Sequence, residues 1–400
     1  MSDVHVQSKP DTWEKLARAA QGATLDVDSE QEVPQRTAPL PLYHAAVGGR
    51  RVPIIKTLLT SACERDCAYC PFRAGRDTRR LTFRPDEFAV TASEVCQAGL
   101  AQGILLSSGI AGGSIATQDR LLDTARLLRE KYQFRGYLHL KLMPGAEEDQ
   151  IVEAMRWADR VSVNLEAPGE PYLSRLAPHK AFWDELFQTL QRAEHLRRTL
   201  APQDFGRLRW PSLVTQFVVG AVGEPDKDLL TWSERLVREL RLVRVYYSPF
   251  RPIPQTPLEH LPPEHVDRVQ RLYKAFYLLR DYKFRVEDLT WDEAGNLLPG
   301  DPKVRWAEHH LAEHPVEINT APRHMLLRVP SIGPKRADII LRARRVARLR
   351  DVSQLRALGL PVERMAPYVL LDGRRPSYQK GFFGESSSHS MCPQHTRAGT

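Results

Sequence analysis

Three of the five cysteines lie within eight consecutive residues, in the run Cys63-Glu-Arg-Asp-Cys67-Ala-Tyr69-Cys70. This run follows an apolar segment that we predict to be a strand, so the three thiols should project from one loop. Thiolates at this spacing can ligate three irons of a [4Fe-4S] cubane and leave the fourth iron without a protein ligand. A zinc site and plain core cysteines are the alternatives. Zinc sites, however, usually draw on two separated ligand pairs, and the sequence has no second pair.

The spacing of these cysteines, with an aromatic residue before the last one, resembles the CxxxCxxC motif of the radical S-adenosylmethionine (SAM) superfamily. The resemblance covers about residues 50–260. It implies a [4Fe-4S] cluster whose open iron chelates SAM through amino and carboxylate groups. One electron from the reduced cluster would cleave a C–S bond and give methionine and a 5′-deoxyadenosyl radical. We expect an electron donor such as flavodoxin or ferredoxin as a partner.

The resemblance also implies SAM contacts at the ends of two expected strands. Ser107, Ser108 and Gly109 stand where the superfamily has a Gly-Gly-Glu-like segment that receives the SAM amino group, although no Glu is present here. Asn164 and Glu166 end another strand, where polar side chains meet the ribose or carboxylate of SAM. Their alternation along the strand places both on one face. Asn164 could instead cap the following turn.

Two further segments are expected to contact the adenine of SAM. Tyr69 resembles the residue whose backbone contacts the adenine amine. Residues 218–223, which include Gly220, resemble the segment that packs against the adenine ring. Gly220 and Gly223 could equally be ordinary turn residues.

Apolar strands that alternate with amphipathic helices must position these residues. We expect strands at 52–60, 103–108, 137–143, 160–166, 213–220 and 242–249, and helices at 86–101, 118–132, 147–158, 172–198, 227–240 and 263–282. This alternation is typical of a parallel sheet covered by helices, an α/β fold. Six β/α units predict a partial (β/α)6 version of the TIM barrel, in which reactive groups lie on the loops after the strands.

Several other polar residues of the expected barrel are candidates for substrate contact. His139 and Lys141 alternate along one strand, so both could face the barrel mouth. Tyr246, Tyr247 and Arg251 lie at the end of the last strand and could stack on a base or bind a phosphate. Packing roles inside the barrel are the alternative for His139 and Lys141.

A second motif lies near the C-terminus, where helical patterns at 319–328 and 335–346 are joined by a short turn. The turn resembles the hairpin of helix-hairpin-helix modules, in which backbone N–H groups at the start of a helix bind a phosphate. Ser331 stands where that pattern has Gly, and a Ser is strained if the position needs a positive φ. The expected nucleic-acid contacts are Ser331, Gly333, Lys335 and Arg336.

The distribution of charge supports a polyanionic partner for this module. The chain has 57 Lys and Arg against 49 Asp and Glu, a formal net charge of +8. Residues 301–380 hold 16 of the former and 8 of the latter, so they carry the whole excess. This favours DNA, or RNA, bound mainly through phosphates. A solvated Arg face on a packing or protein-binding module is the alternative.

We expect five segments along the chain. They are an N-terminal extension (1–45), a radical SAM barrel (46–285), a linker (286–315), a small all-α helix-hairpin-helix module (316–371) and a disordered tail (372–400). The odd number of cysteines does not suggest a disulfide framework, and Cys96 is expected in the core. Neither a long apolar span nor a hydrophobic signal core is present in the sequence. We therefore expect a cytoplasmic protein without a membrane partner.

Over most of its length the chain resembles a bacterial family described as DNA modification or repair radical SAM proteins. The likeness rests on LLTSACERDCAYC, LLSSGI, GYLHLKLMPGA and DRVSVNLEAP, together with the C-terminal hairpin. It implies an enzyme that abstracts hydrogen from a nucleotide in DNA, or RNA, in order to modify or repair it. Two alternatives stay open. One is a non-catalytic iron-sulfur protein that binds nucleic acid, and the other is a radical SAM enzyme that acts on a small metabolite.

Overall fold

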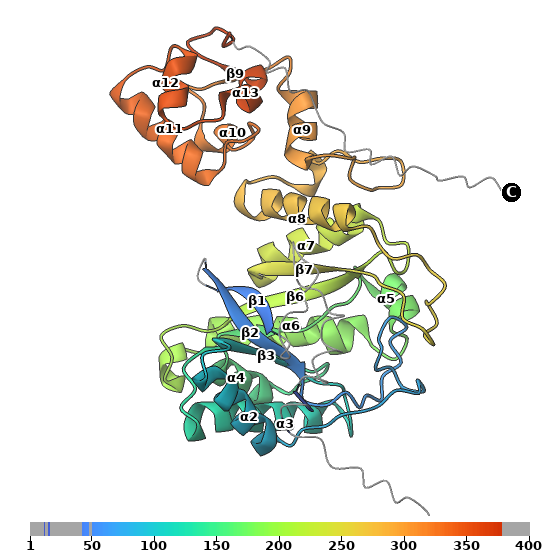
Figure 1. Cartoon of the computed structure of the whole chain (residues 1–400). Coiled ribbons are helices and arrows are strands. Elements are labelled where there is room, and N and C mark those ends of the chain that lie inside the picture. Colours follow the sequence, from blue (N-terminus) through green and yellow to red (C-terminus); the bar gives the residue numbers. More distant parts are fainter. Residues whose placement is uncertain (1–11, 13–14, 17–41, 48–49, 378–400) are drawn as a thin grey trace, which may run out of the picture. The chain divides into compact units, whose positions relative to one another are not determined.

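The computed structural model describes residues 42–47 and 50–377, together with Thr12, Lys15 and Leu16. It contains two compact units, shown in Figure 1. The first unit spans Met1–Arg280 and Phe284–Pro302, and the second spans Asp281–Lys283 and Lys303–Thr400. Most of the predicted N-terminal extension lies outside the described residues, as do Cys392 and the tail from residue 378.

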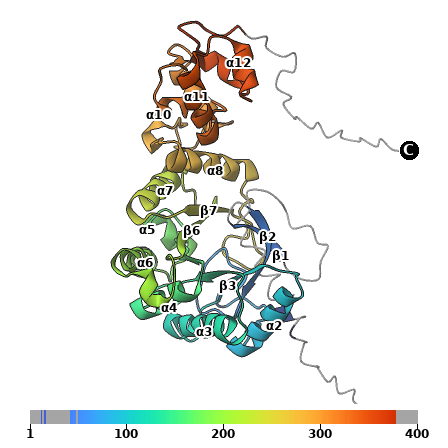
Figure 2. The same ribbon diagram turned by 90° about the vertical axis from the view of Figure 1, so that its left-hand side faces the viewer.

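The first unit is built on a seven-stranded sheet whose spatial order is the chain order, β1 to β7. The parallel strands are β2 (Arg50–Leu58), β3 (Gly103–Ser107), β4 (Tyr137–Lys141), β5 (Arg160–Ser162), β6 (Ser212–Val219) and β7 (Arg244–Pro249). The sheet curls into part of a barrel with helices on its outer side, as Figure 2 shows. The predicted partial (β/α)6 barrel is confirmed.

Strand β1 (Leu42–Val47) was not predicted, because its residues were assigned to the N-terminal extension. It pairs antiparallel with β2, with Tyr43 opposite Ile54. Its six residues are too few for period-2 alternation to be distinctive. Further upstream, Lys15 forms an ion pair of 2.6 Å with Glu87, and Leu16 is fully buried. Part of the extension therefore packs on the barrel.

Seven helices of the described chain follow the barrel strands. They are α2 (Pro85–Gln97), α3 (Ser114–Arg126), α4 (Glu148–Trp157), α5 (Glu170–Leu176), α6 (Gln188–Thr199), α7 (Asp226–Leu240) and α8 (Val266–Asp281). The single helix predicted over 172–198 is divided into α5, a π-helical turn and α6. Pro178 explains the break, since proline lacks an N–H group and disfavours helical backbone at the residue before it. The break creates the segment that carries Lys180.

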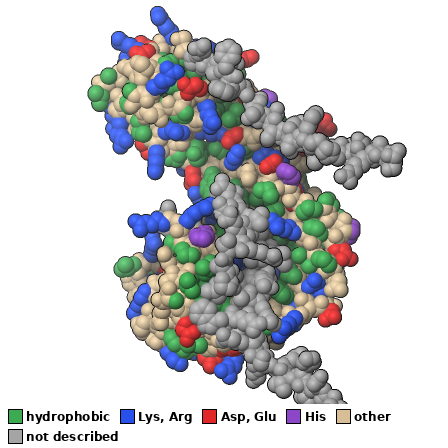
Figure 3. Space-filling model, viewed as in Figure 1, with side chains coloured by type: hydrophobic (Ala, Val, Ile, Leu, Met, Phe, Trp, Pro, Cys, Tyr) green, Lys and Arg blue, Asp and Glu red, His purple; other side chains and the backbone are tan. Residues whose placement is uncertain are grey.

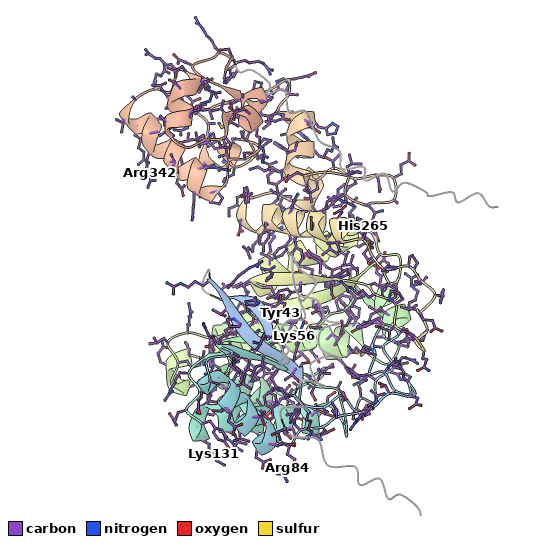
Figure 4. All side chains as sticks on the ribbon, in the orientation of Figure 1. Tyr43, Lys56, Arg84, Lys131, His265 and Arg342 are labelled. Atoms are coloured by element: carbon purple, nitrogen blue, oxygen red, sulfur yellow. The ribbon has the colours of Figure 1, made fainter. Side chains whose placement is uncertain are left out.

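The apolar core lies between the sheet and the helices. In β4, Leu138 and Leu140 are fully buried against the helices. Because side chains alternate along a strand, His139 and Lys141 face the other way, into the barrel. The same alternation places Lys56 of β2 on the inner side, where it lies over the ring of Tyr43 (Figure 4). Buried polar side chains therefore lie among apolar ones on the inner side of the sheet.

The second unit consists of short helices and one small pair of strands. The helices are α9 (Pro302–His310), α10 (Arg323–Leu326), α11 (Pro334–Val346), α12 (Val352–Ala357) and α13 (Val362–Met365), and β8 (Val316–Glu317) pairs in parallel with β9 (Val369–Leu370). The prediction of an all-α module was therefore incomplete. Two-residue strands leave no periodic pattern in a sequence.

Two boundaries of the C-terminal part also differ from the prediction. The interval 286–315 was expected to be an irregular linker but contains α9. Asp301 followed by Pro302 is a helix start signal that the sequence offered. The disordered tail was expected from residue 372, yet the Gly373 N–H donates to Glu317 Oε2 at 2.8 Å. Among the described residues, no helix is long and apolar enough to cross a membrane.

Candidate functional site

The three clustered cysteines line one cavity of about 210 Å³ at the carboxyl ends of the barrel strands. Strands β2, β3, β4, β6 and β7 contribute to its wall, as does the segment that follows β5. The sequence-predicted residues found there are Cys63, Cys67, Cys70, Tyr69, Ser107, Ser108, Gly109, Asn164 and Glu166. The fold thus brings together residues that are up to about a hundred positions apart, which is the arrangement a barrel active site requires.

The loop that carries the cysteines, residues 59–84, is held in shape by its own backbone contacts. The guanidinium of Arg80 donates to the carbonyl oxygens of Ser61 (2.9 Å), Phe72 (2.7 Å) and Arg73 (2.8 Å). Buried carbonyl groups need such partners, and one arginine with five N–H donors can satisfy several. Arg80 therefore fixes both sides of the loop around the cysteines.

A second set of contacts ties the cysteine loop to the segment between α5 and α6. The Ala68 N–H donates to the Leu176 carbonyl at 2.8 Å, and Arg65 forms an ion pair of 2.8 Å with Glu185. Asp66 Oδ1 accepts from the backbone N–H of His179 at 3.2 Å. These contacts hold the loop on both sides of Cys67.

Gly109 has a packing role that the sequence did not reveal. Its N–H donates to the Thr60 carbonyl at 2.7 Å, and a Cβ at this position would overlap the carbonyl oxygen of Ala62. The absence of a side chain thus allows the end of β3 to lie directly against the cysteine loop. Ser108 Oγ donates to the Gly109 carbonyl at 2.7 Å, so this hydroxyl already has one local partner.

The thiols are well shielded from water. Cys67 is buried at 7% exposure, and Cys63 and Cys70 are half-buried. Desolvation raises the pKa of Cys67 and raises that of Cys70 to about 12. The ammonium of Lys180 opposes this effect at Cys67. Bound iron would deprotonate such thiols, as metals do to coordinating cysteines.

The donor set fits a cluster better than a single ion. In the described part of the chain, no three His, Cys, Asp or Glu side chains are arranged to hold one metal ion. A cubane distributes three thiolates over three irons, so its ligands need not meet at one point. Three thiols from one shaped loop on one cavity wall match that requirement.

Asn164 and Glu166 both face the cavity, although the backbone that places them there is irregular. Strand β5 ends at Ser162, and Glu166 has a φ of +65°. A left-handed conformation is unfavourable for a residue with a side chain and is often found at functional sites. The prediction that regular strand alternation reaches Glu166 was therefore wrong.

The hydrogen bonds of these two side chains leave groups open to a ligand. Lys141 Nζ donates to Asn164 Oδ1, so the Asn164 amide NH₂ points elsewhere. Lys180 Nζ donates to Glu166 Oε1 at 2.8 Å, whereas the buried Oε2 accepts no hydrogen bond from a described residue. Burial and the Glu166 charge raise the pKa of Tyr69 well above its ordinary value. The hydroxyl of Tyr69 thus lies close to the Glu166 carboxylate, whose Oε2 can still accept a hydrogen bond from a hydroxyl or amine of a bound molecule.

Sequence reasoning missed Lys180. It follows Glu166 by 14 residues, in a stretch predicted to be helical, so neither spacing nor pattern linked the two. Burial alone would lower the pKa of Lys180, but the charges of Cys67 and Glu166 outweigh burial and raise it. The helix-breaking Pro178 was the only local signal that this segment leaves a helix.

Gly220 lies outside the cavity wall, whereas Val218 is part of it. Gly220 has a φ of +89°, its N–H donates to the Glu224 carboxylate, and a Cβ there would overlap the side chain of Glu264. These contacts agree with the alternative that Gly220 is an ordinary turn residue.

The other candidates in the barrel divide into two groups. Tyr247 is 1% exposed and bonds Ser233, so it is a packing residue. His139 Nε2 lies 2.8 Å from Ser162 Oγ, and burial, with the charge of Arg160, holds the pKa of His139 well below its usual range. Lys141 and Arg251 do line the cavity.

The predicted hairpin of the second unit joins α10 to α11. Ser331 has a φ of +64°, so the strain expected for a Ser at this position is present. Gly333 is the N-cap of α11, and Lys335 and Arg336 are exposed on its first turn. Arg336 Nη1 donates to the Ser331 carbonyl at 2.8 Å, which ties the turn to the helix.

No protein family model matches the sequence, and no curated protein sequence matches it either. Solved structures with a similar fold include the FeFe-hydrogenase maturase HydG from Carboxydothermus hydrogenoformans, at 13% identity over 57% of this chain and 51% of that chain (TM-score 0.43). Methylornithine synthase (PylB) shares 13% identity over 80% of this chain and 76% of that chain, with a TM-score of 0.43. The radical SAM methyltransferase TsrM from Kitasatospora setae shares 17% identity over 51% of this chain and 38% of that chain, with a TM-score of 0.39.

The chain spans about half the length of the hydrogenase maturase chain it matches. These likenesses concern the fold, and the assignment of chemistry therefore rests on the residues of the cavity.

Proposed function

We propose that this protein is a radical SAM enzyme in which Cys63, Cys67 and Cys70 hold a [4Fe-4S] cluster. The observation that carries the proposal is the position of the three thiols. They leave one fixed loop and line a cavity at the carboxyl ends of the barrel strands, together with Asn164 and Glu166. When bound, the cluster and SAM would supply a 5′-deoxyadenosyl radical for hydrogen abstraction.

The residues around the cysteines suit the binding of SAM. Glu166 Oε2 can accept a hydrogen bond from a ribose hydroxyl, and the Asn164 amide can donate to a carboxylate or ribose oxygen. Lys180 holds the Glu166 carboxylate in place. Apolar residues such as Met143 and Val218 form other parts of the wall and exclude water from a reactive intermediate.

The proposal includes a one-electron donor such as flavodoxin or ferredoxin and a location in the cytoplasm. All four described cysteines are free thiols. Free thiols and iron-sulfur ligation suit a reducing compartment. Formation of 5′-deoxyadenosine and methionine from SAM by the reduced protein tests the enzymatic function against a non-catalytic iron-sulfur protein.

We further propose that the substrate is a nucleotide within DNA, or RNA. The hairpin between α10 and α11 supports this, because the N-terminus of α11 can direct backbone N–H groups at a phosphate. Arg342 and Arg345 extend the positive charge along the exposed side of α11. Lys and Arg side chains are spread over the visible face of this unit in Figure 3.

Replacing Lys335 and Arg336 by Ala together should weaken binding of duplex DNA about equally for unrelated sequences, because phosphate contacts carry little sequence information. The slope of log affinity against log salt concentration should decrease by roughly one for each contact that is lost. Fluorescence anisotropy over a salt series measures both effects. Arg356→Ala, which removes an exposed arginine paired with Glu363, is the matched control and should change neither.

DNA affinity that is the same in the double variant and the parent would speak against the nucleic-acid role of the hairpin. The second unit would then be a packing or protein-binding module, and a small metabolite would become the favoured substrate class.

A further inference from the structure

The cysteine loop carries an excess of positive charge directly after its last cysteine. Residues 71–80, which we call the basic segment, follow Cys70. They include one acidic residue, Asp77, and four arginines, namely Arg73, Arg76, Arg79 and Arg80. Among the described residues, none of the four arginines forms an ion pair. Arg79 is exposed and the other three are half-buried, so the basic segment presents net positive charge at the surface.

The hydrogen bonds of these arginines fix their positions without cancelling their charge. Arg76 donates to the carbonyl oxygens of Pro254 and Pro71, both at 2.9 Å. Arg80 donates to three carbonyl oxygens of the loop itself. A carbonyl group accepts a hydrogen bond but carries no net charge, so each guanidinium stays positive. The basic segment is therefore a preformed region of positive potential.

Only a short stretch of chain separates this charge from the cysteines. The Phe72 N–H donates to Cys70 Sγ at 3.4 Å, and the Arg73 N–H donates to the Cys70 carbonyl at 3.3 Å. Three residues span at most about 11 Å, so the Cα atoms of Cys70 and Arg73 lie within that distance. Arg80 reaches back to the Phe72 carbonyl at 2.7 Å, which brings Arg79 to the same part of the loop.

The two sides of the cysteine loop face different surroundings. Pro71 and Phe72 line the cavity, where SAM and the substrate would bind, whereas residues 73–80 do not line it. A molecule that delivers an electron must come close to the thiolates, because electron transfer slows steeply as the distance between redox centres grows. It must also leave the cavity free for SAM and the substrate. The outer side of the loop, formed by the basic segment, meets both requirements.

We propose that the basic segment is the docking surface of the one-electron donor, and that the donor is a small redox protein with an acidic face around its flavin or iron-sulfur group. This inference rests on the proposed function and deepens it, because it assigns a surface to the donor. In the step itself, the cluster gains one electron and the donor loses one. Opposite charges steer such proteins together, and electron-transfer complexes bury little area, so a small patch suffices.

Nucleic acid is also a polyanion, but the position of the basic segment favours the donor. A nucleotide must reach the cavity side of the loop before a hydrogen atom can be abstracted from it. The arginines belong to the part of the loop outside the cavity wall. The test below therefore includes duplex DNA as the competing partner.

The test compares Arg79→Glu with Lys131→Glu in the full-length chain loaded with its cluster. Arg79 is exposed, and its side chain forms no hydrogen bond or ion pair with a described residue, so the contacts of Arg76 and Arg80 stay in place. Lys131 is also exposed but lies just before β4, at the amino ends of the strands (Figure 4). Both substitutions change the net charge equally.

Two measurements are made on each variant. Fluorescence anisotropy follows the binding of a dye-labelled acidic flavodoxin and, separately, an acidic ferredoxin, at low and at high salt. The rate of SAM cleavage is then compared between the reduced donor protein and excess dithionite, a small reductant that needs no docking surface. Iron content shows that each variant holds its cluster.

We expect at least one donor protein to bind, and its affinity to fall as salt screens the charges. Arg79→Glu should weaken this binding at least fivefold at low salt, and Arg79→Gln should weaken it less. Lys131→Glu should bind the donor as the parent does. Cleavage driven by the donor protein should slow in the same order, whereas cleavage driven by dithionite should proceed at the parent rate in every variant.

The proposal is overturned if neither donor protein binds, or if Arg79→Glu and Lys131→Glu bind the donor equally well. It is also overturned if Arg79→Glu weakens the binding of duplex DNA and leaves donor binding unchanged, since the basic segment would then serve nucleic acid. Failure of the proposed function looks different. The protein would then lack iron, or lack SAM cleavage with dithionite, whereas donor binding can still be measured.

Discussion

Replacement of Cys63, Cys67 or Cys70 by Ala should abolish the cluster in anaerobically reconstituted protein. The parent should contain about four irons and four sulfides per chain, because three thiolates in one loop match a cubane with one open iron. Each single variant loses one of only three protein ligands, so iron should fall to a small fraction of the parent value. Iron and sulfide analysis, together with the absorbance of the cluster, measures this.

Cys96→Ala is the matched control. Cys96 lies on α2, away from the cavity wall, and burial raises its pKa to about 11. Its removal should leave the iron content unchanged. Full iron content in a variant that lacks Cys63, Cys67 and Cys70 together would show that this loop does not hold the cluster.

Glu166→Gln should weaken SAM binding by about tenfold or more, while cluster content stays near that of the parent. The substitution keeps a hydrogen-bond acceptor for Lys180 but removes the negative charge of the carboxylate, whose buried Oε2 is the expected acceptor for SAM. Hydrogen bonds to charged groups are worth about 1.5–3 kcal/mol, and about 1.4 kcal/mol corresponds to a factor of ten. Equilibrium binding of SAM to the oxidised protein measures the change.

Glu153→Gln provides the comparison, because Glu153 lies on α4 and is not part of the cavity wall. It should bind SAM as the parent does. Parent-like SAM affinity in Glu166→Gln would exclude Glu166 from the SAM site and would leave its strained backbone without a functional explanation.

The alternation of largely apolar segments with amphipathic helices was sufficient to predict the parallel part of the barrel. It was insufficient for β1, a six-residue strand that exists through its pairing with β2. Sequence pattern also failed to predict β8 and β9, because a strand of two residues is too short to show an alternating pattern. Helix α9 was missed although Asp301 and Pro302 marked its start.

The candidate site shows the same division between local and tertiary information. The cysteine loop could be predicted because its chemistry is contained in eight consecutive residues. The partners that shape it could not, since Arg80 acts through backbone carbonyls and Lys180 reaches Glu166 only because the chain breaks at Pro178. The face of Lys141 follows from strand alternation, but its hydrogen bond to Asn164 is a property of the folded cavity.

Reductive cleavage of SAM decides whether this cavity holds a radical enzyme. Reconstituted protein, chemically reduced and supplied with SAM in the absence of substrate, should slowly form 5′-deoxyadenosine and methionine in equal amounts, as measured by chromatography. The Cys67→Ala variant should form neither. Protein that carries a full cluster and binds SAM, yet yields no 5′-deoxyadenosine on reduction, would contradict the proposed function and favour a non-catalytic iron-sulfur protein.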